Sequence, residues 1–136
     1  MAHEARLIIE SKKYYVIECD YEIIQPVKDN GQPAGHPSGG MIHLTLVSPD
    51  NNDLFLHEWM QSPVEHKEGE IVFSVVNAAN TSVKNVKFKR AHCVRLYEYF
   101  NAHNGDMQMI TKITISPAEF SFGNSNDIVF KNDQLK

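Results

Sequence analysis

The fold is decided by residues 14–47, which read YYVIECDYEIIQPVKDNGQPAGHPSGGMIHLTLV. From Tyr15 to Ile23, apolar or aromatic residues occupy every second position, and acidic residues recur between them. This period of two is typical of a β-strand with one face in a core and the other face in water or against a polar partner. The alternation resumes over residues 42–46, so an antiparallel strand pair is predicted.

The loop between these two strands is long and rich in glycine and proline. It runs from Lys28 to Gly40, and its backbone bends easily but cannot continue a central strand. Loops of this length without structure of their own are usually functional or mobile. We therefore expect a protruding arm.

The remaining sequence predicts further strands with the same alternation. They are expected at residues 6–10, 71–76, 84–100, 107–115 and 119–123. The longest of them has an ambiguous phase, and a β-bulge near Arg90 accounts for it. His103-Asn104-Gly105-Asp106 predicts a tight hairpin turn.

One short helix is predicted over residues 54–61. Asp53 precedes it and is a residue type whose side chain accepts the free amides of a first helical turn. Phe55 and Trp59 lie four residues apart on one side, and Pro63 ends the helix. Because so short a helix is marginal alone, we expect Phe55 and Trp59 to anchor it to the core.

These elements predict a mainly β fold. The expected architecture is a small antiparallel β-barrel of two packed sheets, with one short α-helix between strands three and four and the long protruding loop between strands two and three. The 136 residues suit a single domain, 1–136, in which 124–136 form a C-terminal tail.

Charge and composition exclude several classes of partner. The net charge of −4 offers no basis for neutralising phosphates, so no nucleic-acid partner is expected. No apolar run approaches the roughly 20 residues that span a bilayer, and the amino terminus has no signal-peptide core. We expect neither membrane insertion nor a conventional leader. Cys19 and Cys93 lie inside strand patterns and are expected as buried reduced thiols, although a disulfide between them stays open.

The sequence does not predict a catalytic or metal site. The seven histidines include no closely spaced ligand pair, and only a site built from distant strands, such as His43 with His92, stays open. Ser38 lacks the glycine two positions earlier that a nucleophile elbow needs. We expect no cofactor, no metal and no enzymatic activity.

Six segments, taken in their order and spacing, resemble the tube protein of the type VI secretion system, the haemolysin-coregulated protein family, and in particular its divergent branch. The segments are residues 14–21, 31–33 with 39–44, 53–60, 69–73, 87–91 and 115–119. The resemblance covers the chain to about Gly123.

The resemblance implies a structural subunit that forms hexameric rings. These rings would stack into a hollow tube that sheath contraction expels together with effectors. The implied partners are further copies of this chain and the sheath, spike or baseplate and effector proteins of the secretion system. The implied localisation is cytoplasmic during assembly and secreted without a signal peptide on firing.

The resemblance also suggests roles for particular residues. The loop expected to set ring stacking includes Asp29, Asn30, Gly31, Gln32, Pro33, Gly39 and Gly40. The residues expected to face the lumen are Glu18, Asp20 and Glu22, for which a plain outer surface is the alternative. Val72 and Val76 are expected to help close the ring.

Two other classes of function stay open. A small-molecule carrier barrel would need an interior cavity, and a cupin-like metal enzyme would need a metal site.

Overall fold

A computed structural model describes residues 2–25, 27–35, 38–48, 53–76, 82–101, 108–123 and 128–131. The elements are β1 (Ala2–Ile9), β2 (Lys12–Ile24), β3 (Ser38–Val47), α1 (Phe55–Gln61), β4 (Lys67–Val76), β5 (Ser82–Asn101), β6 (Gln108–Ser116), β7 (Glu119–Phe122) and β8 (Ile128–Lys131). The predicted mainly β fold with one short helix between the third and fourth strands is confirmed.

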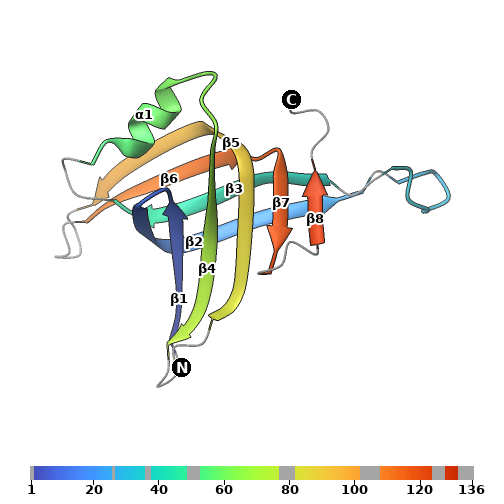
Figure 1. The fold of residues 1–136 in the computed structure, drawn as a ribbon, viewed down its shortest axis with the longest axis horizontal. Helices are drawn as coiled ribbons and strands as arrows, with labels where there is room; N and C mark the ends of the chain where they lie inside the picture. Colours follow the sequence, from blue (N-terminus) through green and yellow to red (C-terminus); the bar gives the residue numbers. More distant parts are fainter. Residues whose placement is uncertain are drawn as a thin grey trace.

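Six of the strands close into a ring. The hydrogen-bonded order is β4-β1-β2-β3-β6-β5, and a further pairing of β4 with β5 completes the barrel (Figure 1). These six pairs of neighbouring strands are all antiparallel. Strand β7 adds to the first half of β5, and β8 adds to β7. The predicted tail therefore contains a paired strand, Ile128–Lys131, and its other residues lie outside the described ranges.

The interior of the barrel is filled by apolar side chains from every wall. The largest fully buried ones are Trp59, Phe88, Phe120, Leu7, Ile9, Ile42, Leu44, Leu46, Leu56, Ile71, Ile113 and Ile115. Close packing extends to the backbone at Gly69, where an added Cβ would lie 2.5 Å from the carbonyl oxygen of Ile8. Glycine is therefore required at this position of β4, where it pairs with Ile9 of β1.

The predicted phase of β2 is wrong in its first half. Tyr15 and Ile17 are 57% and 51% exposed, whereas Tyr14 is buried. The register shifts between Val16 and Glu18, where β2 carries an extra residue opposite β3. Such a bulge moves all later side chains to the other face. As a result, only the second half of β2 keeps the alternation that the sequence suggested.

Strand β5 is one strand with two partners along its length. Its first half pairs with β4 and β7, and its second half pairs with β6. The change of partner occurs at Arg90, whose φ of 50° is left-handed and accompanies a register shift against β4. A second shift lies between Cys93 and Arg95. The sequence predicted the first irregularity and not the second.

Helix α1 is fixed at its start by Asp53. The carboxylate accepts the backbone N–H of Phe55 at 3.0 Å and the hydroxyl of Tyr14 at 3.4 Å, and it lies 3.6 Å from Lys12 Nζ. Burial raises the pKa of Tyr14, and the nearby carboxylate raises it further. Trp59 is fully buried, while Phe55 is half-buried and packs against the core.

We predict that Trp59→Ala lowers the free energy of unfolding by about 3–5 kcal/mol, because the surrounding walls cannot collapse into so large a void. Denaturant unfolding measures the loss. The matched control is Met60→Ala, since Met60 follows it on the same helix but is 36% exposed, and a change within about 0.5 kcal/mol is expected. Equal losses for the two variants would contradict the placement of Trp59.

Candidate assembly surfaces

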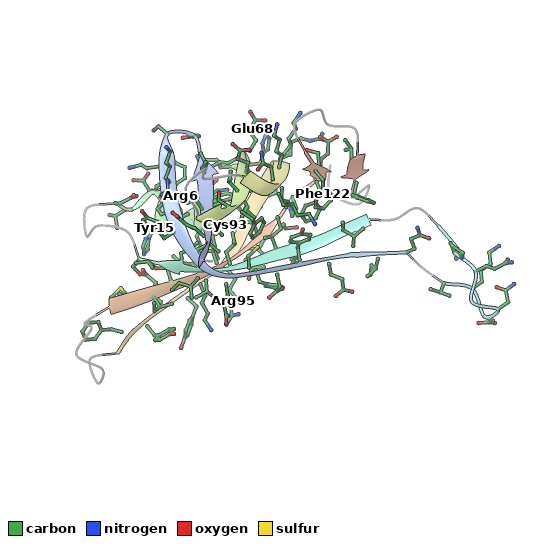
Figure 2. All side chains as sticks on the ribbon, turned by 90° about the horizontal axis from the view of Figure 1, so that it is seen from below. Arg6, Tyr15, Glu68, Cys93, Arg95 and Phe122 are labelled. Carbon is green, nitrogen blue, oxygen red and sulfur yellow. The ribbon has the colours of Figure 1, made fainter. Side chains whose placement is uncertain are left out.

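Four strands form a long sheet that extends beyond the rest of the barrel. They are β2, β3, β6 and the second half of β5, in that order. Figure 2 shows this sheet nearly edge-on, with Arg95 on its lower side and Cys93 on the interior side. The register shift between these two residues places them on opposite faces although they are only two positions apart.

Both outer edges of this sheet lack a strand partner among the described residues. β1 pairs with β2 only over Lys12–Val16, so residues 17–24 of β2 are bonded on one side alone, to β3. β4 and β7 pair with β5 only up to Ala91, so residues 92–101 are bonded on one side alone, to β6. An unpaired edge offers backbone donors and acceptors to another chain.

The outward face of the sheet changes charge from one edge to the other. Glu18, Asp20 and Glu22 are all exposed and form an acidic row on β2. The predicted sharing of one face by these three residues holds, because each alternates with a partly buried residue. Side chains at such i,i+2 positions are about 7 Å apart, which makes the row a charged stripe rather than an acid/base pair.

The opposite edge carries cations and aromatic rings. The cross-strand registers place Asp20 opposite His43, His43 opposite Thr114, and Thr114 opposite Arg95. Arg95 lies 5.7 Å above the ring of Tyr97, the rings of Tyr97 and Tyr99 are 5.9 Å apart, and Lys112 lies 5.9 Å from the ring of Tyr99. We call Arg95, Tyr97, Tyr99 and Lys112 the basic ladder.

The basic ladder was not predicted from the sequence. Its signal is the alternation Arg95-x-Tyr97-x-Tyr99, which was hidden because the shift after Cys93 changes the phase of β5. Both irregularities of β5 must be placed before this pattern can be assigned to a face.

The predicted arm projects away from the body of the protein. Figure 1 shows it leaving the far ends of β2 and β3. Its tip is closed by its own hydrogen bonds, from Lys28 N to Gln32 O at 2.8 Å and from Gly31 N to Lys28 O at 2.9 Å. Asn30 Oδ1 accepts Gln32 N at 3.1 Å, and Gly31 supplies a φ of 86°.

Every described arm residue from Val27 to Gly35 is exposed. The arm therefore has a tip that is closed by its own hydrogen bonds and whose side chains are largely exposed. Gly39 and Gly40, predicted to lie in the loop, instead belong to β3, and Gly39 pairs with Ile23. The register shift beside this pair adds a residue to β3, and glycine tolerates such a bulge.

Val72 and Val76 were expected at a ring contact. Val72 is half-buried on β4, between Arg6 of β1 and Asn85 of β5. The side chain of Val76 lies outside the described part of the chain. Their role in ring closure stays a prediction.

A polar chain links α1 to the sheet. His57 Nε2 lies 2.8 Å from Glu98 Oε1, Thr111 donates to Glu98 Oε2 at 3.0 Å, and Ser48 Oγ lies within hydrogen-bond distance of Thr111 Oγ1. These four residues combine hydroxyl, carboxylate and imidazole groups. None of them lines the surface hollow around Gly69 or the one beside Ile17 and Cys19. Their evident effect is to hold α1 against β5 and β6.

The described residues line at least two hollows on the surface. One of about 570 Å³ lies around Gly69 and includes Glu10, Glu68, Lys87 and Lys89. A second of about 280 Å³ lies where β2 leaves β1, beside Ile17 and Cys19. Both are surface hollows, whereas a carrier needs an interior chamber.

The described residues hold no group of three or more potential metal ligands. His43 Nδ1 instead lies 3.1 Å from Thr114 Oγ1, and the ring of His66 packs edge-on against that of His92. Cys19 and Cys93 are both free thiols, and Cys93 is buried as predicted, whereas Cys19 is only partly buried. No helix among the described residues is long and apolar enough to cross a membrane.

Solved structures define the class of protein. The chain is similar to Hcp1 from Flavobacterium johnsoniae, with 27% identity, coverage of 95% of this chain and 99% of that one, and a TM-score of 0.77. It shares its fold with the secreted protein Hcp3 from Pseudomonas aeruginosa, at 13% identity, 96% and 97% coverage and a TM-score of 0.64. It also shares it with a chain of the anti-feeding prophage baseplate, at 10% identity, 90% and 92% coverage and a TM-score of 0.54. The class is the tube-type β-barrel.

The family follows from the sequence match. A family model described as hemolysin coregulated protein Hcp (TssD) matches residues 1–133, and the chain belongs to this family. A search of the curated proteins finds no match. The family consists of secreted structural tube proteins of the type VI secretion system, so the expectation of a structural, non-enzymatic protein is confirmed.

We predict slow alkylation of both thiols in the folded chain. Burial raises the pKa of Cys19 to about 11, with Asp20 adding to the shift, and burial raises the pKa of Cys93 to about 11. Relative to the usual thiol, the thiolate fraction at pH 8 falls about 100-fold. Iodoacetamide labelling at pH 8, with and without guanidinium, measures this, and Cys19→Ser and Cys93→Ser assign each rate. Fast labelling of the folded chain would contradict the burial.

Proposed function

We propose that this tube protein closes into hexameric rings that stack into a hollow tube, which sheath contraction expels together with effectors. The observation that carries the proposal is the sheet with two open edges. A subunit whose two edges are open and different joins its neighbours head to tail, and such contacts close into a ring when the rotation permits.

Strand directions favour this mode of closure. The sheet β2-β3-β6-β5 has four antiparallel strands, so β2 and β5 run in opposite directions. When the β2 edge of one copy meets the β5 edge of the next, the new pair is again antiparallel. The ring then continues one sheet around its circumference without an unpaired edge.

The outward face of this sheet is the surface that we assign to the lumen. It carries the acidic row Glu18, Asp20 and Glu22 and the basic ladder, and the described strands leave it uncovered. A hydrated wall of charged and polar groups suits a channel through which other proteins slide without adhering.

The arm is assigned to stacking between rings. It leaves the body along the direction of β2 and β3, and its tip is shaped by internal hydrogen bonds. A segment that is ordered without touching its own barrel is available to a neighbouring ring. Partners beyond the tube, namely sheath, spike or baseplate and effector proteins, are proposed from membership of the family.

We predict that removal of the arm separates ring formation from stacking. Ile24 and Ser38 are direct partners across β2 and β3, so residues 25–37 can be replaced by Asn-Gly, which favours a two-residue hairpin turn. Light scattering is expected to give a mass of about six times the 15.5 kDa chain, with no tubes in electron micrographs.

The matched control replaces the Glu10-Ser11 turn with Asn-Gly. Ile9 and Lys12 are partners across that turn, and Glu10 already has a φ of 56°, so the barrel accepts the change and the arm is left intact. This variant is expected to behave as the original chain. Monomers after removal of the arm would assign the arm to ring closure instead.

A further inference from the structure

The acidic row and the basic ladder lie on the same face of one sheet, but at opposite edges. The acidic row is on β2, whose residues 17–24 are bonded only to β3. Arg95, Tyr97 and Tyr99 lie on the half of β5 that is bonded only to β6, and Lys112 lies on β6 itself. Between the two edges the outward side chains include Thr45, Thr114 and the exposed His43. The face therefore has a direction, from negative to positive.

The charges at the two edges have few partners of their own. Within the described part of the chain, Glu18, Asp20, Glu22, Arg95 and Lys112 take part in none of the ion pairs. Arg95 and Lys112 lie instead over tyrosine rings. All five charged residues are exposed, so an approaching surface can reach each of them.

We infer that a second copy of this chain pairs with both edges, so that the acidic row of one subunit lies beside the basic ladder of the next. This inference rests on the proposed ring and states which residues of neighbouring subunits recognise one another. Paired strands lie about 4.8 Å apart, which brings side chains on the same face into contact across the junction. Each junction then places three carboxylates beside the guanidinium of Arg95 and two tyrosines, with the ammonium group of Lys112 one strand further from the junction.

The arrangement also selects the correct junction. Two β2 edges brought together would oppose their acidic rows, and two β5 edges would oppose their cations. Like charges on neighbouring strands are destabilising. Only the head-to-tail contact places opposite charges together, and this is the contact that closes a ring.

We call the contact between the acidic row of one subunit and the basic ladder of the next the seam. The seam changes the charge that the wall of the lumen presents to cargo. Its three carboxylates lie beside two cations from the neighbouring subunit, so each junction keeps about one net negative charge instead of three. Cargo then passes a wall that is less acidic than the β2 strands alone would make it.

Two reversed variants test the seam, each altered on one edge only. In the first, E18K/D20K/E22K, both edges are basic, and in the second, R95E/K112E, both edges are acidic. The substituted residues are exposed, so both variants are expected to keep their circular dichroism spectra and melting behaviour. Each variant alone is expected to need a protein concentration at least about tenfold higher to form rings.

An equimolar mixture of the two variants is expected to restore rings. Every junction between unlike variants again places opposite charges together, and alternation closes in a ring with an even number of subunits. Sedimentation velocity or light scattering measures the masses. For the unmodified chain, raising the salt from about 50 mM to about 500 mM shortens the screening length about threefold and is expected to weaken the rings.

The matched control is K13E/K84E, which changes the net charge by the same amount as R95E/K112E. Lys13 and Lys84 are both exposed and lie outside the two edges, since Lys13 pairs with Ile8 and Lys84 with Phe73. This control is expected to form rings at the concentrations of the unmodified chain.

The possible outcomes separate the seam from the ring. Rings that persist in both reversed variants would overturn the seam and leave the ring standing. Failure of the mixture to assemble, or an equal loss in K13E/K84E, would likewise overturn the seam. An unmodified chain that stays monomeric at every concentration would overturn the proposed ring itself.

Discussion

The rest of the structure depends on the break in β5 at Arg90. A strand of 20 residues that kept one set of partners would lengthen a flat sheet, whereas here the first half pairs with β4 and the second half with β6. The left-handed conformation of Arg90 and its extra residue turn the strand between these partners. Because β4 also pairs with β1, this one turn closes the barrel. It also frees the second half of β5 from β4, so closure of the barrel and exposure of an edge have the same cause.

Most of the elements could be predicted from the sequence because their signals are local. Period-two alternation, the Asp53 start and the Pro63 stop require no knowledge of distant contacts, and the strands and α1 lie close to their expected positions. The faces were harder to predict. The exposure of Tyr15 and the burial of Tyr14 depend on one extra residue opposite Leu46, and the pairing of β2 with β3 determines where that residue is accommodated. The sequence of one strand does not determine its register, because the register also depends on the strand with which it pairs.

The same limit explains which parts of the candidate surfaces could be predicted. The acidic row lies after the bulge in β2 and within one unbroken alternation, so its shared face was visible in the sequence. The basic ladder lies after two irregularities in β5 and draws Lys112 from another strand. Gly39 and Gly40 look like loop residues because glycine is rare in strands, but the pairing of β3 with β2 incorporates them. Surfaces that involve several strands become predictable only after the register is known.

The closed barrel and the two open edges have separate physical roles. Apolar residues from all six walls fill the interior, so the fold does not depend on its neighbours for a core. Open edges, however, invite indiscriminate pairing, and natural sheets counter this with charged side chains. In this chain the charges of the two edges differ in sign. In the proposed ring, an edge of one charge repels a copy of the same edge and pairs with the opposite one. The same residues would then both prevent aggregation of the free chain and direct its assembly, whereas a sheet with uncharged edges could pair in several ways.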